Sequence, residues 1–264
     1  MKVAAIQMVS GTQVEANIAT AQKLVAQAAA DGAQLLLLPE YWAIMGWKDT
    51  DKVAVREELG QGRIQDAMAQ MARQHGVWIA GGTLPLACDD PAKVFNSTLV
   101  FNPAGEQVGR YDKVHLFGFR KGTEAYDEAQ TIVPGRHPVC VDTPAGKTGI
   151  AVCYDLRFPE LFRAPGSVNL WLLSAAFTYT TGSAHWEILL RARAIENQCY
   201  LLASAQGGVH ENGRRTWGHS MLIDPWGEVL ARVPEGEGVA LGEIDFGRID
   251  EVRASLPALQ HRRL

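Results

Sequence analysis

The stretch KTGIAVCYDLRFPE at residues 147–160 joins a strand-like run to a reactive side chain. Its first seven residues form a mostly apolar run that is typical of a buried strand. The run ends at Cys153, after which the chain becomes polar and reaches Pro159. A cysteine in this place is either a small buried hydrophobe or a nucleophile, and the run alone favours packing.

Outward from this stretch, apolar runs that suit strands alternate with segments that suit helices along the 264 residues. We expect helices at 13–30, 62–74, 158–164 and 184–198, and strands at 3–9, 34–38, 77–82, 94–102, 106–113, 147–153, 168–174, 200–206, 219–224 and 239–245. Crossovers and hairpins mixed in this way predict an α/β fold with mixed sheets in layers. No linker-like stretch divides the chain, so we expect a single domain over residues 1–264.

Two long segments, 118–137 and 207–217, lack clear periodicity. We expect both to be surface loops, and loops of this length inside a compact domain often carry functional residues. Asn96-Ser97-Thr98 matches a glycosylation sequon, but we interpret these residues as part of the strand at 94–102.

Composition argues against several classes of function. The formal net charge is −4 without a basic block, which is unlike a nucleic-acid-binding protein. No apolar run is long enough to span a membrane. The seven histidines lack metal-binding spacing and no CxxC or nucleotide-binding glycine motif is present, so we expect neither a metal nor a cofactor. Four scattered cysteines and no convincing signal peptide lead us to expect a reduced, cytoplasmic protein.

Three polar side chains lie at the expected ends of strands: Glu40 after LLLLP, Lys113 after the second hairpin strand, and Cys153. Sites in α/β folds form at the carboxyl ends of strands. A glutamate can accept a thiol proton, and an ammonium favours both a thiolate and an oxyanion, so the three together suit acyl transfer. Spacing alone leaves this open, because each residue also suits packing, a solvated loop or a hairpin end.

The stretches LLLLPEYW (35–42), GRYDKVHLF (109–117) and GIAVCYDLRFPEL (149–161) resemble the three signature blocks of the nitrilase superfamily, the carbon–nitrogen hydrolases. Their order and approximate spacing agree as well. The chain is most similar to the Nit branch, and particularly to the deaminated glutathione amidases. The resemblance implies a nitrilase-type α-β-β-α sandwich with two mixed β-sheets, and a homodimer or higher homo-oligomer.

The resemblance also implies catalytic roles. Cys153 would be the nucleophile, Glu40 the general base, and Lys113 the cation that stabilises the tetrahedral oxyanion, with the backbone N–H of Tyr154 as a second donor. A second glutamate before Pro-Gly is typical of the family, and Glu128 fits this position as a fourth catalytic residue that would hold Lys113 and assist proton transfer. Glu124 and Asp127 are its alternatives.

For substrate binding, the resemblance and the residue types lead to six candidates: Tyr41, Phe117, Tyr154, Arg157, Phe177 and Thr178. Arg157 is expected to pair with a substrate carboxylate, or else to form an ion pair with Asp155 or Glu160. We expect Arg191 and Arg193 to make surface or interface pairs, since Glu187 lies four residues before Arg191. Relatives commonly have proline at the position of Ser174, which lies near the expected wall of the substrate pocket.

We therefore expect an amidase that needs no cofactor. It would use water to convert the terminal amide of a small carboxylate-bearing substrate into acid and ammonia, through a cysteine thioester. The expected substrate is deaminated glutathione. One alternative is an ω-amidase acting on 2-oxoglutaramate-type amides. Another is an inactive nitrilase-like scaffold that binds partners. A true nitrilase is less favoured, because CYDLR replaces the Cys-Trp-Glu of that branch.

Overall fold

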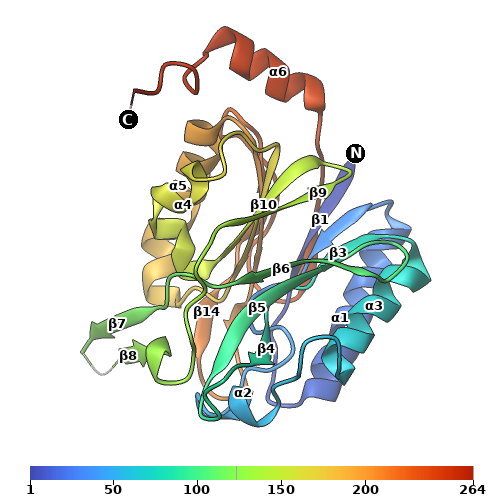
Figure 1. The fold of residues 1–264 in the computed structure, drawn as a ribbon, viewed down its shortest axis with the longest axis vertical. Coiled ribbons are helices and arrows are strands. Elements are labelled where there is room, and N and C mark those ends of the chain that lie inside the picture. Colours follow the sequence, from blue (N-terminus) through green and yellow to red (C-terminus); the bar gives the residue numbers. More distant parts are fainter. Residues whose placement is uncertain (123, 264) are drawn as a thin grey trace.

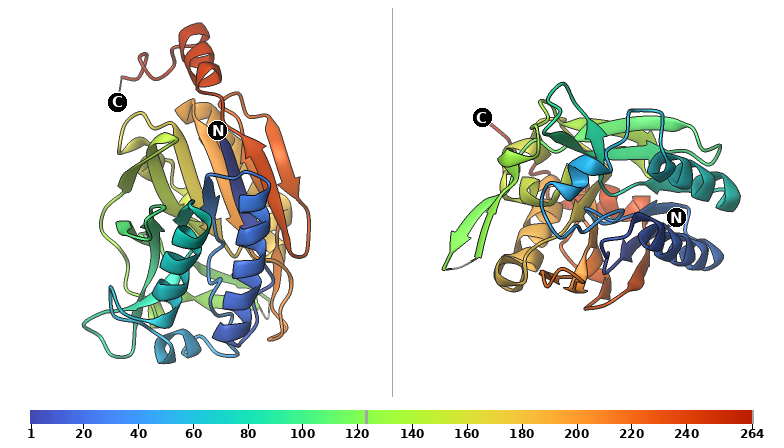
Figure 2. Two further views of the ribbon diagram at one scale, coloured as in Figure 1. Left: turned by 90° about the vertical axis from the view of Figure 1, so that its right-hand side faces the viewer. Right: turned by 90° about the horizontal axis from the view of Figure 1, so that it is seen from below.

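The chain folds into four layers, with two β-sheets packed face to face between two layers of helices (Figure 1). This computed structural model describes residues 1–122 and 124–263. Helices α1 (Val14–Ala30) and α3 (Arg63–His75) lie side by side on the outer face of one sheet (Figure 2). Helices α4 (Pro159–Arg163) and α5 (Tyr179–Asn197) cover the other. The α-β-β-α sandwich is confirmed.

The first sheet is mixed, with a parallel centre and antiparallel strands on both sides. Its order is β17-β1-β2-β3-β5-β4, with β6 paired to β5. The strands are β1 (Lys2–Gln7), β2 (Leu35–Leu37), β3 (Trp78–Ala80), β4 (Leu84–Ala87), β5 (Val94–Phe101), β6 (Gln107–Asp112) and β17 (Gly238–Glu243). The predicted hairpin is confirmed, because β5 and β6 pair antiparallel with Ser97 opposite Asp112.

The second sheet is also mixed and has the order β16-β15-β12-β11-β10-β9. Its strands are β9 (Val139–Thr143), β10 (Gly146–Val152), β11 (Leu170–Ala175), β12 (Tyr200–Ala205), β15 (Ser220–Ile223) and β16 (Val229–Val233). The strands β10, β11 and β12 run parallel, and every residue of β11 and β12 is buried. This explains why these strands have continuous apolar sequences instead of alternating ones.

Two serine hydroxyls join the inner faces of the sheets. The Oγ of Ser174 on β11 donates to the carbonyl of Leu38 at 3.0 Å, and the Oγ of Ser204 on β12 donates to the carbonyl of Ile6. Both serines are buried, so each hydroxyl gains a partner that the apolar core does not offer. Ser174, where proline was expected from the resemblance, therefore fixes the segment that leads to Glu40.

The segments 118–137 and 207–217, which were expected to be surface loops, instead contain short hairpins. The first segment contains the hairpin of β7 (Gly118–Lys121) and β8 (Glu124–Asp127) and the short 3₁₀ helix η1 (Glu128–Gln130). The second contains the hairpin of β13 (Gly207–Val209) and β14 (Arg215–Trp217). All four strands have only three or four residues, which is too few to establish a period. Hairpin β7–β8 projects from the body of the molecule (Figure 1).

Several other elements differ from the prediction. Helix α5 begins five residues earlier than expected, because the Thr178 side chain accepts a hydrogen bond from the backbone N–H of Thr181 at 3.3 Å and caps it. The elements α2 (Asp51–Ala54), β4, β9, β16 and α6 (Phe246–Ser255) were not predicted. No helix in the described part of the chain is long and apolar enough to cross a membrane.

Candidate active site

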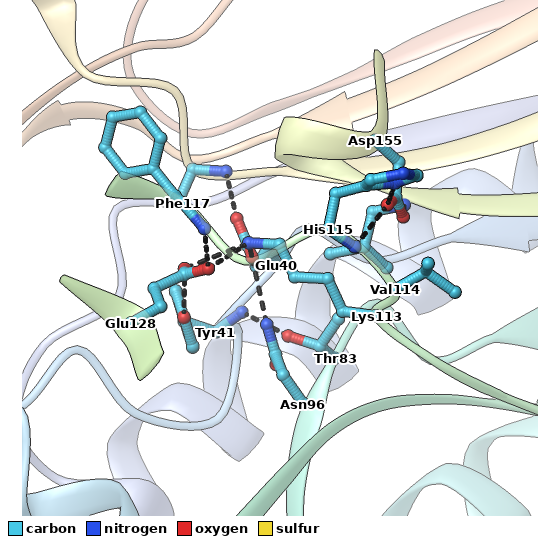
Figure 3. A network of polar contacts seen from close by, with 12 residues as sticks. Glu40, Tyr41, Thr83, Asn96, Lys113, Val114, His115, Phe117, Glu128 and Asp155 are labelled. Atoms are coloured by element: carbon cyan, nitrogen blue, oxygen red, sulfur yellow. Dashed lines mark hydrogen bonds and ion pairs between the residues drawn. The ribbon is translucent and has the colours of Figure 1, made fainter. Parts of the chain in front are cut away.

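The ends of three strands bring the predicted catalytic side chains together between the sheets. Glu40 follows β2, Lys113 follows β6, and Cys153 follows β10. All three are buried, with exposed fractions of 1%, 0% and 7%. Lys113 Nζ lies 2.8 Å from Oε1 of Glu40 and 2.8 Å from Oε2 of Glu128 (Figure 3). An ammonium enclosed by two carboxylates therefore lies beside a buried thiol.

Glu40 is held at both carboxylate oxygens. Its Oε1 accepts from Lys113 and from Nδ2 of Asn96 at 3.0 Å, and its Oε2 accepts from the backbone N–H of Ala176 at 2.9 Å. The next residue, Tyr41, has a positive φ of 56°, and its backbone N–H donates to Thr83 Oγ1 at 2.9 Å. Positive φ is uncommon for an aromatic residue and marks a sharp turn. Because the hydrogen bond to Thr83 holds this turn, the turn fixes the direction in which Glu40 points.

Glu128 is the second acidic residue at the lysine. Both its oxygens accept from Lys113 Nζ, at 2.9 and 2.8 Å, while Tyr41 Oη and the backbone N–H of Phe117 donate to it at 2.8 and 2.7 Å. The alternatives lie elsewhere: Glu124 accepts from Thr180 Oγ1, and Asp127 caps η1.

The charges of this cluster follow from burial and proximity. Burial by itself lowers the pKa of Lys113, but Glu128 and Glu40 outweigh it, so that its pKa is raised. Burial raises the pKa of Glu128, but Lys113 outweighs it and the net shift is downward. Burial and then the charge of Glu40 raise the pKa of the Cys153 thiol, against the opposing effect of Lys113. At neutral pH the site therefore holds a thiol, an ammonium and an ionised Glu128.

Cys153 lies on a sharp turn rather than in the strand. Strand β10 ends at Val152, and Cys153 opens the 3₁₀ helix η2 (Cys153–Arg157) with a positive φ of 50°. The buried carboxylate of Asp155 holds this turn by accepting from the backbone N–H of Val152 at 2.9 Å and from Tyr111 Oη at 2.7 Å. Strained backbone at a reactive side chain is a common property of catalytic nucleophiles.

Helix α5 supports the far end of the same turn. Arg193 is buried and donates from Nε and Nη2 to the carbonyl of Leu156 at 3.0 and 2.8 Å. Arg193 is therefore buried instead of lying on the surface, although it does form an ion pair, with Glu196 at 2.7 Å. The expected surface pair is confirmed for Arg191, which lies 3.9 Å from Glu187 on the exposed side of α5.

Five of the six predicted substrate residues line the cavity beside Cys153: Phe117, Tyr154, Arg157, Phe177 and Thr178. Its volume is about 10 Å³, which is close to what one water molecule needs. The rings of Phe117 and Tyr154 meet edge to face with centroids 5.3 Å apart. The sixth candidate, Tyr41, is not among the residues that line it.

Arg157 forms no ion pair with either alternative partner, Asp155 or Glu160. Its guanidinium carbon lies 5.8 and 5.4 Å from the ring centroids of Tyr154 and Phe177, and its Nη1 lies 3.3 Å from Nδ1 of His185. Its charge is thus stacked on aromatic rings without a carboxylate partner in the described part of the chain.

Two residues of this site were not predicted. Asn96 belongs to the sequence that matches a glycosylation sequon. It is only 2% exposed and donates to Glu40, which agrees with its interpretation as a strand residue. Arg214 lines the cavity from the turn between β13 and β14, and its Nη2 donates to the carbonyl of Ala176 at 3.2 Å. A polar residue inside a buried strand was the available signal for Asn96, whereas Arg214 had none.

This arrangement suits nucleophilic attack on an acyl carbon. The thiol has a carboxylate that can take its proton, and the lysine supplies positive charge for an oxyanion. In the described residues, no group of three or more His, Cys, Asp or Glu side chains is placed to hold a metal ion.

Comparison with known proteins identifies the family. The profile of the carbon-nitrogen hydrolase family matches residues 2–254. The chain belongs to this family. The predicted recognition and the predicted enzyme class, a hydrolase of carbon–nitrogen bonds, are thereby confirmed.

Individual carbon-nitrogen hydrolases agree in sequence and fold. The deaminated glutathione amidase of Yersinia enterocolitica is 40% identical over 266 residues, which covers 99% of this chain and 92% of the relative. The C. elegans NitFhit protein has a TM-score of 0.92 at 35% identity, covering 99% of this chain and 65% of that one. A mutant amidase from Nesterenkonia sp. AN1 has a TM-score of 0.79 at 25% identity, covering 97% of this chain and 98% of that one. In that structure, acrylamide has been added to the active-site cysteine.

Proposed function

We propose that this protein is an amidase in which Cys153 is the nucleophile, Glu40 the general base and Lys113 the main donor to the oxyanion. The observation that carries the proposal is the position of Lys113, fixed between two carboxylates beside a buried thiol. The relatives that are amidases support it, as does the cysteine modified in the Nesterenkonia enzyme.

The first half of the reaction forms a thioester. Because the pKa of Cys153 is raised, the thiol loses its proton to Glu40 only as sulfur attacks the amide carbon. The raised pKa of Lys113 keeps it an ammonium, so it donates to the developing oxyanion instead of acting as a base. The backbone N–H of Tyr154 is the proposed second donor. Glu40 then returns its proton to the departing nitrogen, and the C–N bond breaks.

The second half of the reaction releases the acid. Glu40, again ionised, takes a proton from water as the water oxygen attacks the thioester carbonyl. The same oxyanion donors act on the second tetrahedral intermediate. Its collapse breaks the C–S bond and restores the thiol. Glu128 holds Lys113 through both steps and carries no proton in this scheme.

Deaminated glutathione is the proposed substrate. The name of the Yersinia relative supports this choice, as do Arg157 and Arg214, two cations at the cavity without a carboxylate partner among the described residues. Both amide bonds of this compound are secondary, so the nitrogen leaves as an amine. The predicted terminal amide and ammonia apply to short ω-amides of the 2-oxoglutaramate type, which are the second candidate.

The protein is further proposed to form a homodimer or higher homo-oligomer and to work in the cytoplasm. Large exposed apolar side chains support the first point: Ile188 and Ile195 on α5 are 70% and 46% exposed, and Trp226 is 56% exposed. Four free cysteines, one of which must stay reduced to react, support the second. Light scattering and cell fractionation test these points. A single domain over residues 1–264 stays a prediction.

A rate measurement separates an amidase from an inactive scaffold. Purified protein is given deaminated glutathione and 2-oxoglutaramate, and release of amine and of ammonia is followed for the wild type, Cys153→Ala and the control Cys88→Ala. We expect Cys88→Ala to retain full activity and Cys153→Ala to lose at least about a thousandfold. Activity in Cys153→Ala would exclude the covalent mechanism, and no activity of the wild type on either compound would favour the scaffold.

A further inference from the structure

A second pocket of about 400 Å³ adjoins the catalytic cavity. It lies between hairpin β7–β8, the segment around residues 44–52 and the turn at 212–214. Arg214 lines both spaces, and we call the larger one the outer pocket. Ala176 connects the outer pocket to the proposed catalytic base. Its carbonyl accepts a hydrogen bond from Arg214, and its backbone N–H donates one to Glu40.

The guanidinium of Arg214 is incompletely satisfied. It contacts the carbonyl of Ala176, the sulfur of Met45 at 3.8 Å and the ring of Tyr126 at 5.0 Å. Its buried Nε has no hydrogen-bond partner, and no carboxylate of the described residues forms an ion pair with it. A buried donor without a partner costs stability, so such a donor is often kept for a ligand.

Lys52 of α2 is a second cation in the outer pocket. Its side chain is only 12% exposed and lies 5.2 Å from the ring centroid of Tyr41. Its polar contacts are weak: Thr131 Oγ1 at 3.3 Å and Asp49, whose side chain is 70% exposed, at 3.7 Å. Burial lowers the pKa of Lys52 by more than the charge of Asp49 raises it, so the carboxylates near this cation compensate its burial only in part.

We propose that Arg214 and Lys52 make the outer pocket a binding site for a second carboxylate, the one on the amine half of an extended secondary amide. The scissile amide then lies at Cys153, and the leaving amine extends past Arg214 toward Lys52. Tyr126, which also lines this pocket, offers its hydroxyl to the peptide-like groups between the two points. Asn212 instead holds the wall of the pocket, because its Nδ2 donates to the carbonyl of Gly46 at 2.7 Å and its Oδ1 accepts from the backbone N–H of Arg214 at 2.9 Å.

This inference rests on the proposed amidase function and adds a specificity to it. The catalytic cavity alone, with its volume of about 10 Å³, does not accommodate both halves of an extended substrate, whereas the neighbouring volume of about 400 Å³ accommodates a dipeptide-sized group. A short ω-amide leaves the outer pocket empty. The two cations therefore distinguish extended amides with a distal carboxylate from short ones.

The experiment compares two compounds that differ only at the distal end. One is deaminated glutathione, and the other has an alcohol in place of its distal carboxylate. For each, kcat/KM is measured for the wild type, Lys52→Met, Lys52→Arg and the control Lys23→Met, which replaces an exposed lysine of α1. The dissociation constants of both compounds are measured with Cys153→Ala and with the double variant that adds Lys52→Met.

The wild type should prefer the carboxylate about tenfold to a hundredfold, as expected for one charge-assisted hydrogen bond. Lys52→Met should lose most of this preference, while Lys52→Arg and Lys23→Met keep it. An equal preference in the wild type and Lys52→Met would overturn the inference. If the wild type hydrolyses neither compound, the proposed function fails. The dissociation constants then still decide the inference, since equal values for the two compounds, or no binding, would contradict it.

Discussion

Lys113 Nζ lies 2.8 Å from Oε1 of Glu40, and the two side chains are 0% and 1% exposed. A buried ion pair of this kind is costly to assemble, because both charges leave water. The structure offsets that cost by giving Lys113 a second carboxylate and giving Glu40 two further donors, Asn96 and the N–H of Ala176. The pair is therefore arranged to hold positive charge at a fixed point beside Cys153.

Replacement of this ammonium should affect both rate and stability. We expect Lys113→Met to lower kcat about 10²–10³-fold, because it removes an oxyanion donor. It should also lower the free energy of unfolding by about 3–5 kcal/mol, since two buried carboxylates lose their cation. Urea denaturation and steady-state kinetics measure the two effects, with Lys23→Met as the control. Retained activity with an unchanged midpoint would show that Lys113 has neither role.

Asn96 positions the proposed base without touching the thiol. Its Nδ2 donates to Oε1 of Glu40 at 3.0 Å, and a hydrogen bond to a charged group contributes about 1.5–3 kcal/mol. We expect Asn96→Ala to lower kcat about tenfold or more and to change KM little, because the base is less well oriented when substrate is bound. A change confined to KM would instead place Asn96 in substrate binding.

Arg193 and Arg191 provide a matched pair on α5. Arg193→Met removes both donors from the buried carbonyl of Leu156, and an unpaired buried acceptor costs about 1–3 kcal/mol. Arg191→Met removes a half-exposed ion pair with Glu187 and one hydrogen bond, from Nε to the carbonyl of Gly227 at 2.7 Å, and should cost about 1 kcal/mol. Thermal or urea unfolding tests the difference. Equal losses in the two variants would mean that the turn after Cys153 does not depend on α5.

His210 gives the protein a pH-dependent stability. It is buried, with Nδ1 2.9 Å from the carbonyl of Ser10 and Nε2 2.8 Å from Thr216 Oγ1, and burial lowers its pKa from 6.5 to about 4. Between these values only the unfolded chain gains the proton, so stability falls as pH falls from 6.5 to about 4. The expected loss is about 3 kcal/mol.

The control for this effect is the exposed histidine His137. Urea midpoints between pH 7.5 and 4.5 should fall less steeply for His210→Gln than for the wild type, whereas His137→Gln should follow the wild type. Parallel curves for all three proteins would mean that His210 is already able to take a proton in the folded state.

The ends of strands and the resemblance together located three residues of the site. Glu40 and Cys153 follow apolar runs, and the carboxyl ends of strands converge in α/β folds. Lys113 follows the polar strand β6, so only the resemblance singled it out. The pairing of Lys113 with Glu128 also agrees with the resemblance. The positive φ of Cys153 was not predicted, because the turn is held partly by contacts with distant parts of the chain, from Tyr111 to Asp155 and from Arg193 to Leu156.

Residues on short or irregular elements could not be found in this way. Arg214 lies between two three-residue strands, and its position at the cavity depends on contacts with Met45, Tyr126 and Ala176, which are far away in sequence. Lys52 lies on a helix of four residues with no buried face to produce a period. Such residues are located by tertiary packing, which local patterns do not encode.

Cys153 is proposed to form a thioester with the acyl half of the substrate. Intact-mass measurement of the protein, quenched in acid during turnover of deaminated glutathione, shows whether this bond forms, and peptide mapping locates the adduct. We expect the added mass of the acyl half on the peptide that contains Cys153, and no addition in Cys153→Ala. Turnover with unmodified Cys153 at every quench time, or the same adduct in Cys153→Ala, would contradict it.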